Sequence, residues 1–283
     1  GTLKIYSNSS ALNAASDLAS EAAAMGTRHV ILNSSELFEL EPSLVEAKGL
    51  VGGIHYPDDI SGDARRFCTA LSRACLESGI KICLNSSVDE ILVRGGKFGG
   101  VRVNGKVAPS DFCVLAAGCG SKALVEPIGI KLPIEPVKGY SITVDTKDWG
   151  LRPNMPVIDE SRHAAICPLG SRLRIAGTAE FAGLNADMVE TRINNLFDVC
   201  EALFPLAKSF DRSSGVSPWF GFRPMTPDGV GIIGRTDLEG LFLNTGHGHL
   251  GWTMAPGSGK LLADLISHSP TFLSKTDYLL SRF

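Results

Sequence analysis

The amino-acid sequence predicts a mixed α/β protein that combines helix–strand units with antiparallel β-structure. Three observations support this fold class. Segments of helical period are followed by strand-like runs, glycine-punctuated meanders occur near residues 88–118, and residues 130–177 are β-rich and punctuated by proline. Because these patterns are interleaved along the chain, we expect two domains woven from discontinuous segments.

The first eighty residues are predicted to alternate helices and strands. Gly26 ends the first helical pattern, Pro42 stops a second, short one, and Gly79 ends a third of about five turns. Residues 52–59, GGIHYPDD, are interpreted as a turn-rich stretch. The expected elements are strands at 1–7, 29–33 and 80–85 and helices at 10–26, 34–44 and 61–79.

The remainder is predicted from turn signals and apolar runs. Gly95-Gly96 and Asn104-Gly105 indicate hairpin turns between short antiparallel strands. The run FCVLAA at 112–117 is typical of a strand buried on both faces. Further strands are expected at 131–145, 156–161, 163–170, 172–178, 232–235 and 240–246, and helices at 187–205 and 251–267, the last with its proline near the first turn.

Composition narrows the function. With 283 residues, 44% of them hydrophobic, the chain can bury one large core or two modest ones. The 27 basic and 30 acidic residues form no long block, which argues against a dedicated nucleic-acid partner. We find neither an apolar run of membrane-spanning length nor a signal peptide. The seven scattered cysteines, without a C-x-x-C pair, fit a reducing compartment, so we expect a cytoplasmic protein.

Three short motifs resemble functional signatures but lack their context. GCGSKA at 118–123 fits G-x-G-x-x-[GA], yet it leads into a short helix and a proline-rich stretch. GSGKLLADL at 257–265 lacks the spacing of a phosphate-binding loop. His247 and His249 are one residue apart in a glycine-rich turn with no third ligand cluster nearby, so we expect no metal.

The strongest functional pattern lies near the end of the sequence. GFRPMTPDG at 221–229 carries Arg223, and NTGHGHLGWTM at 244–254 is a glycine loop that enters a helix. A helix N-terminus stabilises developing negative charge, and an arginine can hold a carboxylate bidentately. This combination suits the oxidation of an amino acid on a flavin. On spacing alone, a surface ion-pair arginine beside a tight turn explains the pattern as well.

A family resemblance decides between these readings. Residues 221–266 closely resemble the C-terminal signature of the bacterial D-amino-acid dehydrogenase small subunit, a group related to glycine oxidase and D-amino-acid oxidase. Further segments resemble that family in the same order: 1–15, 52–67, 113–121, 128–144 and 157–185. The resemblance implies a Rossmann-like FAD domain at 51–128 plus 221–283 and an antiparallel substrate domain at 1–50 plus 129–220.

The resemblance also implies a site. Arg223 would bind the substrate carboxylate, and His249 would lie beside the substrate through its backbone. Tyr140 and His163, in the sheet of the substrate domain, would contact the substrate; a packing or hydrogen-bonding role within the sheet is the alternative. FAD would be contacted by Val88, Ala116, Ala117, Gly118, Gly246, Gly248, His249, Leu250, Gly251, Trp252 and Thr253.

One departure from the family is large. The family begins with a strand, a G-x-G-x-x-G loop and a ribose-binding glutamate, and none of these precedes GTLKIY. The FAD domain is therefore expected to be incomplete, with an exposed apolar sheet edge and weak or no FAD retention by this chain alone.

The implied activity is FAD-dependent oxidative deamination of D-amino acids, with a quinone or other electron acceptor. The resemblance allows self-association into a homo-oligomer and peripheral association with the cytoplasmic face of the inner membrane. Two alternatives stay open at this stage. One is a truncated, non-catalytic fragment without a competent FAD site, and the other is a glycine or secondary-amine oxidase.

Overall fold

The computed structural model describes residues 1–205, 212, 215–274 and 276–283, which form two compact units. Unit 1 comprises Gly1–Phe67, Gly139–Glu180 and Ala186–Gly221. Unit 2 comprises Cys68–Lys138, Phe181–Asn185 and Phe222–Phe283. The chain therefore passes between the units several times, and strands β8 (Glu135–Asp145) and β12 (Val216–Met225) each contain a unit boundary.

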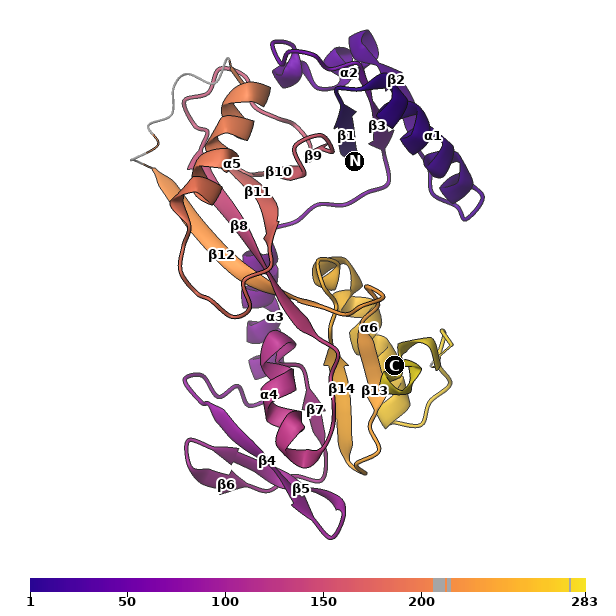
Figure 1. The fold of residues 1–283 in the computed structure, drawn as a ribbon, viewed down its shortest axis with the longest axis vertical. Coiled ribbons are helices and arrows are strands. Elements are labelled where there is room, and N and C mark those ends of the chain that lie inside the picture. Colours follow the sequence, from indigo (N-terminus) through magenta and orange to yellow (C-terminus); the bar gives the residue numbers. More distant parts are fainter. Residues whose placement is uncertain (206–211, 213–214, 275) are drawn as a thin grey trace. The chain divides into compact units, whose positions relative to one another are not determined.

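Unit 1 is built on an eight-stranded sheet with the strand order β12-β8-β11-β10-β9-β1-β3-β2 (Figure 1). Strand β1 pairs in parallel with β9 and antiparallel with β3, so it joins the N-terminal strands to the β-rich middle of the chain. The other strands are β1 (Thr2–Tyr6), β2 (Val30–Asn33), β3 (Gly52–Tyr56), β9 (Val157–Asp159), β10 (Ala164–Leu169) and β11 (Arg172–Glu180).

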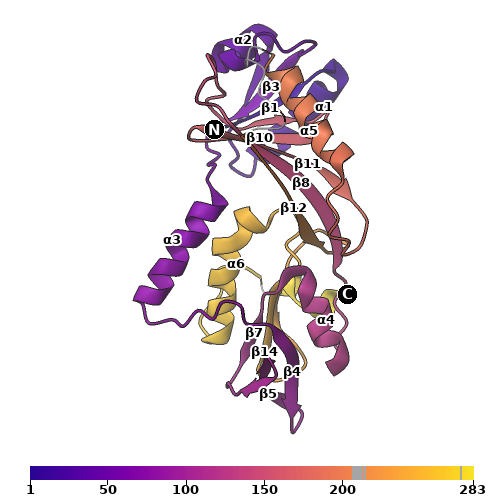
Figure 2. The ribbon, with the colours of Figure 1, turned by 90° about the vertical axis from the view of Figure 1, so that its left-hand side faces the viewer.

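The helices of unit 1 begin at clear capping residues or bury an apolar face. Asn8 caps α1 (Ser9–Ala23), and Asn33 with Glu36 forms a capping box at α2 (Ser34–Leu40). Helix α5 (Glu190–Leu203) lies along β10 and β11 in two views (Figures 1 and 2). Its buried face includes Leu196, which belongs to the same apolar cluster as Tyr140. Burial of this face anchors α5 to the sheet.

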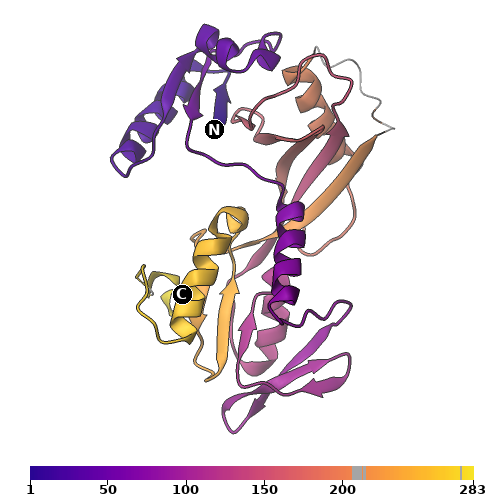
Figure 3. The ribbon, with the colours of Figure 1, turned by 180° about the vertical axis from the view of Figure 1, so that it is seen from behind.

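Unit 2 contains two small sheets. In one, β14 (Leu241–Thr245) pairs antiparallel with β13 (Ile232–Arg235) and in parallel with β7 (Cys113–Leu115). The other has the order β4-β5-β6. Helix α6 (Gly251–Ile266) packs beside β13 and β14 (Figure 3). The remaining elements are β4 (Val88–Arg94), β5 (Lys97–Val103), β6 (Lys106–Ala108), α4 (Ser121–Val125) and α3 (Ala64–Glu77), whose residues up to Phe67 belong to unit 1.

The mixed α/β class is confirmed, but most of the predicted turn-rich stretch 52–59 is a strand. Gly52–Tyr56 form β3, which lies between β1 and β2, and the turn is confined to Pro57 and Asp58. The two glycines that suggested a turn instead allow β1 and β2 to approach β3 closely. A Cβ on Gly52 would lie 2.3 Å from the Leu32 carbonyl oxygen, and one on Gly53 would lie 2.7 Å from the Lys4 carbonyl oxygen.

The predicted strand at 80–85 is also wrong, because no such strand is present in this described segment. Ile80, Ile82 and Leu84 have the right residue types, yet all three are exposed. A strand requires the backbone groups of a neighbouring strand, which residue type alone does not supply.

The run at 112–117 and the last helix differ from the prediction in detail. Strand β7 covers only Cys113–Leu115 and is at the edge of its sheet, so Val114 is 40% exposed and the strand is not buried on both faces. Pro256 is the sixth residue of α6 and lies inside the helix, beyond the first turn.

The two compact units divide the chain at 67/68, 138/139 and 221/222, whereas the resemblance implied functional domains divided at 50/51, 128/129 and 220/221, which stay a prediction. Residues 51–67 belong to unit 1 because β3 is paired within the large sheet. Leu132 and Ile134 are buried in the cluster that also contains Leu115 and Leu243, which places residues 129–138 in unit 2.

Candidate functional site

The carboxyl ends of β7 and β14 meet at one edge of their sheet. The two strands are parallel, with Leu115 opposite Leu243, so the segments that follow both strands emerge on the same side. The buried Thr245 hydroxyl donates to the Gly118 carbonyl oxygen at 3.2 Å and lies 3.2 Å from the Ser121 hydroxyl. Ligands of open α/β sheets bind at such carboxyl edges. This geometry brings Ala116, Ala117 and Gly118 close to the glycine loop 246–250.

The end of β12 runs beside the same loop. The Gly248 amide donates to the Pro224 carbonyl oxygen at 2.9 Å, and Met225 forms an antiparallel bridge with His247. Arg223 therefore lies on the backbone segment that pairs with the glycine loop. Its side chain is half-buried, and burial lowers the pKa of Arg223 from its ordinary value. A guanidinium starts from so high a pKa that it stays charged near neutral pH.

Gly246 and Gly248 are required by the packing of the chain itself. Both have positive φ, +74° and +54°. A Cβ on Gly246 would lie 2.8 Å from Cγ2 of Thr226, and one on Gly248 would lie 2.7 Å from Sδ of Met225. This contact with the turn after β12 is a second reason for glycine here, besides the expected approach of a flavin ring, which stays a prediction.

The N-terminus of α6 opens directly from this loop. Leu250 is its N-cap residue and supplies no side-chain cap to the first turn. The first amide groups of a helix carry partial positive charge and need acceptors from elsewhere. His249, Leu250, Trp252 and Thr253 are exposed, whereas Gly251 is half-exposed. The loop and the first turn can therefore receive an electron-rich or anionic group.

The two histidines of the loop are in different environments. His247 is half-buried, and Gly231 packs so closely on its ring that an added Cβ would lie 2.7 Å from Cδ2. Burial lowers the pKa of His247, so its ring is neutral near pH 7. Its buried Nε2 has no hydrogen-bond partner among the described residues, whereas His249 is exposed. The described part of the chain holds no group of three or more His, Cys, Asp or Glu side chains suited to a metal ion.

Three other predicted residues lie elsewhere. Val88 begins β4, is 40% exposed and pairs with Val103 in the other sheet of unit 2. Tyr140 and His163 belong to unit 1. Tyr140 is buried, and its hydroxyl donates to Glu180 Oε2 at 2.5 Å. His163 is exposed, with φ +49°, in the turn between β9 and β10. Contact of these residues with substrate or cofactor stays a prediction.

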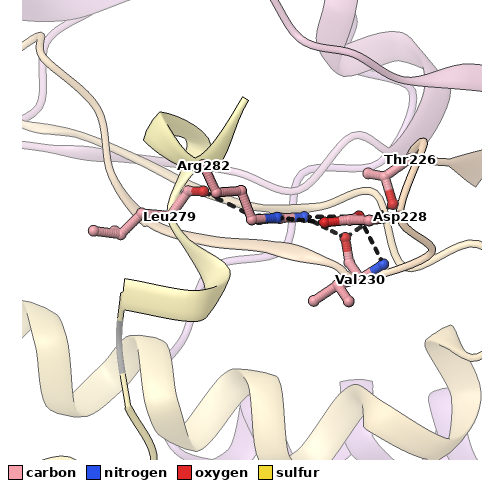
Figure 4. A network of polar contacts seen from close by, with 5 residues as sticks. All are labelled: Thr226, Asp228, Val230, Leu279 and Arg282. Carbon is pink, nitrogen blue, oxygen red and sulfur yellow. Dashed lines mark hydrogen bonds and ion pairs between the residues drawn. The ribbon is translucent and has the colours of Figure 1, made fainter.

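Sequence reasoning missed a polar network that supports the turn after β12 (Figure 4). The Arg282 Nε donates to Asp228 Oδ2 at 2.7 Å, and its Nη2 donates to the Val230 carbonyl oxygen at 2.6 Å. The Asp-Gly pair at 228–229 carries a turn signal, so Asp228 could have been singled out. Nothing in the local sequence around Arg282 points to this contact, which joins residues 54 positions apart.

Comparison with known proteins shows what the chain is similar to. The family described as FAD dependent oxidoreductase matches residues 1–265. The D-amino acid dehydrogenase of Paramagnetospirillum magneticum is 38% identical over 284 residues, which cover 100% of this chain and 67% of that protein. The D-amino acid dehydrogenase of Vibrio cholerae is 37% identical with the same coverage.

Solved structures share the fold. The glycine oxidase of Geobacillus kaustophilus matches with a TM-score of 0.89 and 24% identity over 100% of this chain and 75% of that one. The glycine oxidase of Bacillus cereus matches with a TM-score of 0.85 and 24% identity over 100% and 76%. Among the described helices, none combines the length and the hydropathy that a membrane crossing requires.

Proposed function

Because the chain belongs to the FAD dependent oxidoreductase family, we propose that it oxidises the C–N bond of D-amino acids with FAD held at the mouth of α6. The observation that carries this proposal is the hydrogen bond from the Gly248 amide to the Pro224 carbonyl oxygen. It fixes the Arg223 segment against the loop that opens α6. The similarity to two D-amino acid dehydrogenases supports the choice of substrate class.

The residues at this edge fit a flavin ring. The uncapped first turn of α6 offers amide donors to the electron-rich pyrimidine edge. The buried Nε2 of His247, which has no hydrogen-bond partner among the described residues, leaves one polar group of the loop available to a bound molecule. Ala116, Ala117 and Gly118 follow β7 beside the loop and are proposed to line the nucleotide side. When bound, FAD would supply the acceptor for one hydride, which carries both electrons removed from the substrate.

The chain's own residues would hold the substrate. We assign Arg223 to the substrate carboxylate, which a guanidinium can bind through two parallel hydrogen bonds. This contact orients the α-carbon, which loses its hydrogen as hydride, while the amine, already neutral, loses a proton to give the imino acid. Water then hydrolyses the imino acid to an oxo acid and ammonia. A side-chain base is not required, and the α6 amides stabilise the negative charge that develops at the acceptor.

Two finer features belong to the same proposal. The electron acceptor would be a quinone, which the enzyme would meet by peripheral association with the cytoplasmic face of a membrane. The 283 residues alone would hold FAD weakly, because the resemblance assigns the main diphosphate contacts to a glycine loop that they do not contain. Titration of the purified chain with FAD, followed by protein fluorescence, measures this affinity. Tight, stoichiometric binding would contradict the expected weak retention.

The central experiment mixes the FAD-loaded enzyme with amino acids in the absence of oxygen. We expect D-alanine to bleach the visible flavin absorbance and to yield pyruvate and ammonia in equal amounts. L-alanine at the same concentration is the stereochemical control. Bleaching by glycine or proline in preference to D-alanine would point to a glycine or secondary-amine oxidase. If none of these compounds bleaches the flavin, the proposal is wrong.

A further inference from the structure

The side chain of Arg282 fixes the turn that follows β12 (Figure 4). Its Nε and Nη2 reach the two carboxylate oxygens of Asp228 at 2.7 and 3.3 Å, and Nη2 also donates to the Val230 carbonyl oxygen at 2.6 Å. Nη1 donates to the Leu279 carbonyl oxygen at 3.1 Å. The side chain is only 15% exposed, so these contacts are more sheltered than those of an ordinary surface ion pair.

The turn itself is organised from within. Thr226 Oγ1 donates to the Val230 carbonyl oxygen at 2.9 Å, and the Val230 amide donates to Asp228 Oδ1 at 3.0 Å. The Gly229 amide donates to the Thr226 carbonyl oxygen at 3.2 Å. The Val230 carbonyl and the Asp228 carboxylate are therefore each shared between the turn and Arg282. The guanidinium holds one side of the turn as a unit.

The same turn also touches the glycine loop. A Cβ on Gly246 would lie 2.8 Å from the Thr226 methyl carbon, and a Cβ on Gly231 would lie 2.7 Å from Cδ2 of the His247 ring. Met225, immediately before the turn, forms an antiparallel β-bridge with His247. A displacement of the turn must therefore displace the loop at two points, and it also moves the end of the strand that carries Arg223.

We propose that Arg282 is a positioning residue for the site, acting through Asp228 and the 226–231 turn on the glycine loop and on Arg223. This inference rests on the proposed function, since it assumes that the loop and Arg223 hold flavin and substrate. Arg282 itself contacts neither group. Its loss should leave the chemistry intact but weaken the binding of both ligands.

The test uses the FAD-loaded enzyme with FAD in excess and measures kcat and KM for D-alanine, together with the FAD dissociation constant. For Arg282→Ala we expect both KM and the FAD dissociation constant to rise about three- to tenfold, with kcat changed less than about twofold. Arg282→Gln keeps the aliphatic part of the side chain. It replaces the alanine variant in these measurements if the alanine variant does not fold. A role confined to stability would lower the midpoint of thermal unfolding without moving KM.

Coupling to Asp228 is measured by a double-mutant cycle. If Arg282 acts through Asp228, the double variant Arg282→Ala with Asp228→Ala should raise KM no more than about the larger single change does. The matched control is Arg102→Ala. It removes another arginine–carboxylate pair of unit 2, Arg102 Nε to Glu90 Oε2 at 3.0 Å, and should leave KM unchanged.

The outcomes separate this inference from the proposed function. If Arg223→Ala raises KM but Arg282→Gln leaves both KM and the FAD dissociation constant unchanged, the positioning role is wrong and the function stands. If Arg223→Ala leaves KM unchanged, the carboxylate assignment itself fails. Fully multiplicative effects in the double variant would show that Arg282 does not act through Asp228.

Discussion

At the residue scale, the glycine loop is shaped by contacts within unit 2 as much as by any ligand. Gly246 combines positive φ with direct contact to Thr226, so a side chain at this position is opposed by both the backbone and the neighbouring turn. From the sequence, the glycines suggested either contact with a flavin or a tight turn. The sequence could not anticipate the turn contact, because Thr226 and Gly246 are brought together only by the pairing of β12 with the loop.

A substitution separates a required glycine from a dispensable one. Gly246→Ala should lower the free energy of unfolding by about 1–3 kcal/mol, because L-residues rarely adopt this φ and Thr226 must move. Gly257→Ala is the matched control in α6, where an added Cβ meets nothing within 4 Å. There the change should raise stability by up to about 1 kcal/mol. Urea unfolding of both variants measures this, and equal effects would contradict the packing argument.

His247 gives the loop a pH dependence of defined sign. Burial lowers its pKa in the folded chain, so the unfolded chain binds a proton more readily as the pH falls below the ordinary value of 6.5. The stability due to the neutral ring is complete above that pH and is lost on acidification. His247→Asn should therefore be less sensitive than the wild type to a change from about pH 7 to about pH 5. An equal loss of unfolding free energy in the wild type and in His247→Asn between the two pH values would argue against a buried neutral ring.

At the element scale, helical periodicity predicted α3 and α5 equally well, but the two helices differ in how far their side chains are buried. Helix α5 buries Leu196 in the core of unit 1, whereas α3 has no buried residue. Strand signals behaved in the same way, because residues 80–85 have strand-like side chains without a paired neighbour. Periodicity reports the preference of a segment, while its partners are set by the tertiary structure.

This difference is measurable by truncation of one leucine in each helix. Leu196→Ala should lower the free energy of unfolding by about 2–5 kcal/mol, because it opens a cavity beside β11. Leu71→Ala in α3 removes a side chain that is 52% exposed, so the cost should stay below about 1 kcal/mol. Thermal and urea unfolding give both values. A cost at Leu71 as large as that at Leu196 would mean that α3 is covered in solution.

At the scale of the whole molecule, the sequence pointed to the segments of the candidate site but not to the Arg282 contact that supports them. Arg223, the segment after β7 and the loop before α6 were singled out from local patterns and family resemblance, and the structure brings these three segments of unit 2 together. Tyr140 and His163 belong to unit 1, where Tyr140 already donates to Glu180. The Arg282 contact with Asp228 could not be predicted, because no short-range pattern links residues so far apart in the chain.

The central claim is that Arg223 holds the carboxylate of an amino acid whose hydride passes to FAD. It is tested most directly by the rate of flavin bleaching in the absence of oxygen, measured against D-alanine concentration for the wild type and for Arg223→Leu, with Arg102→Leu as control. We expect the half-saturating concentration to rise about tenfold or more in Arg223→Leu only, with the oxidised flavin spectrum unchanged. An unchanged half-saturating concentration would contradict the account.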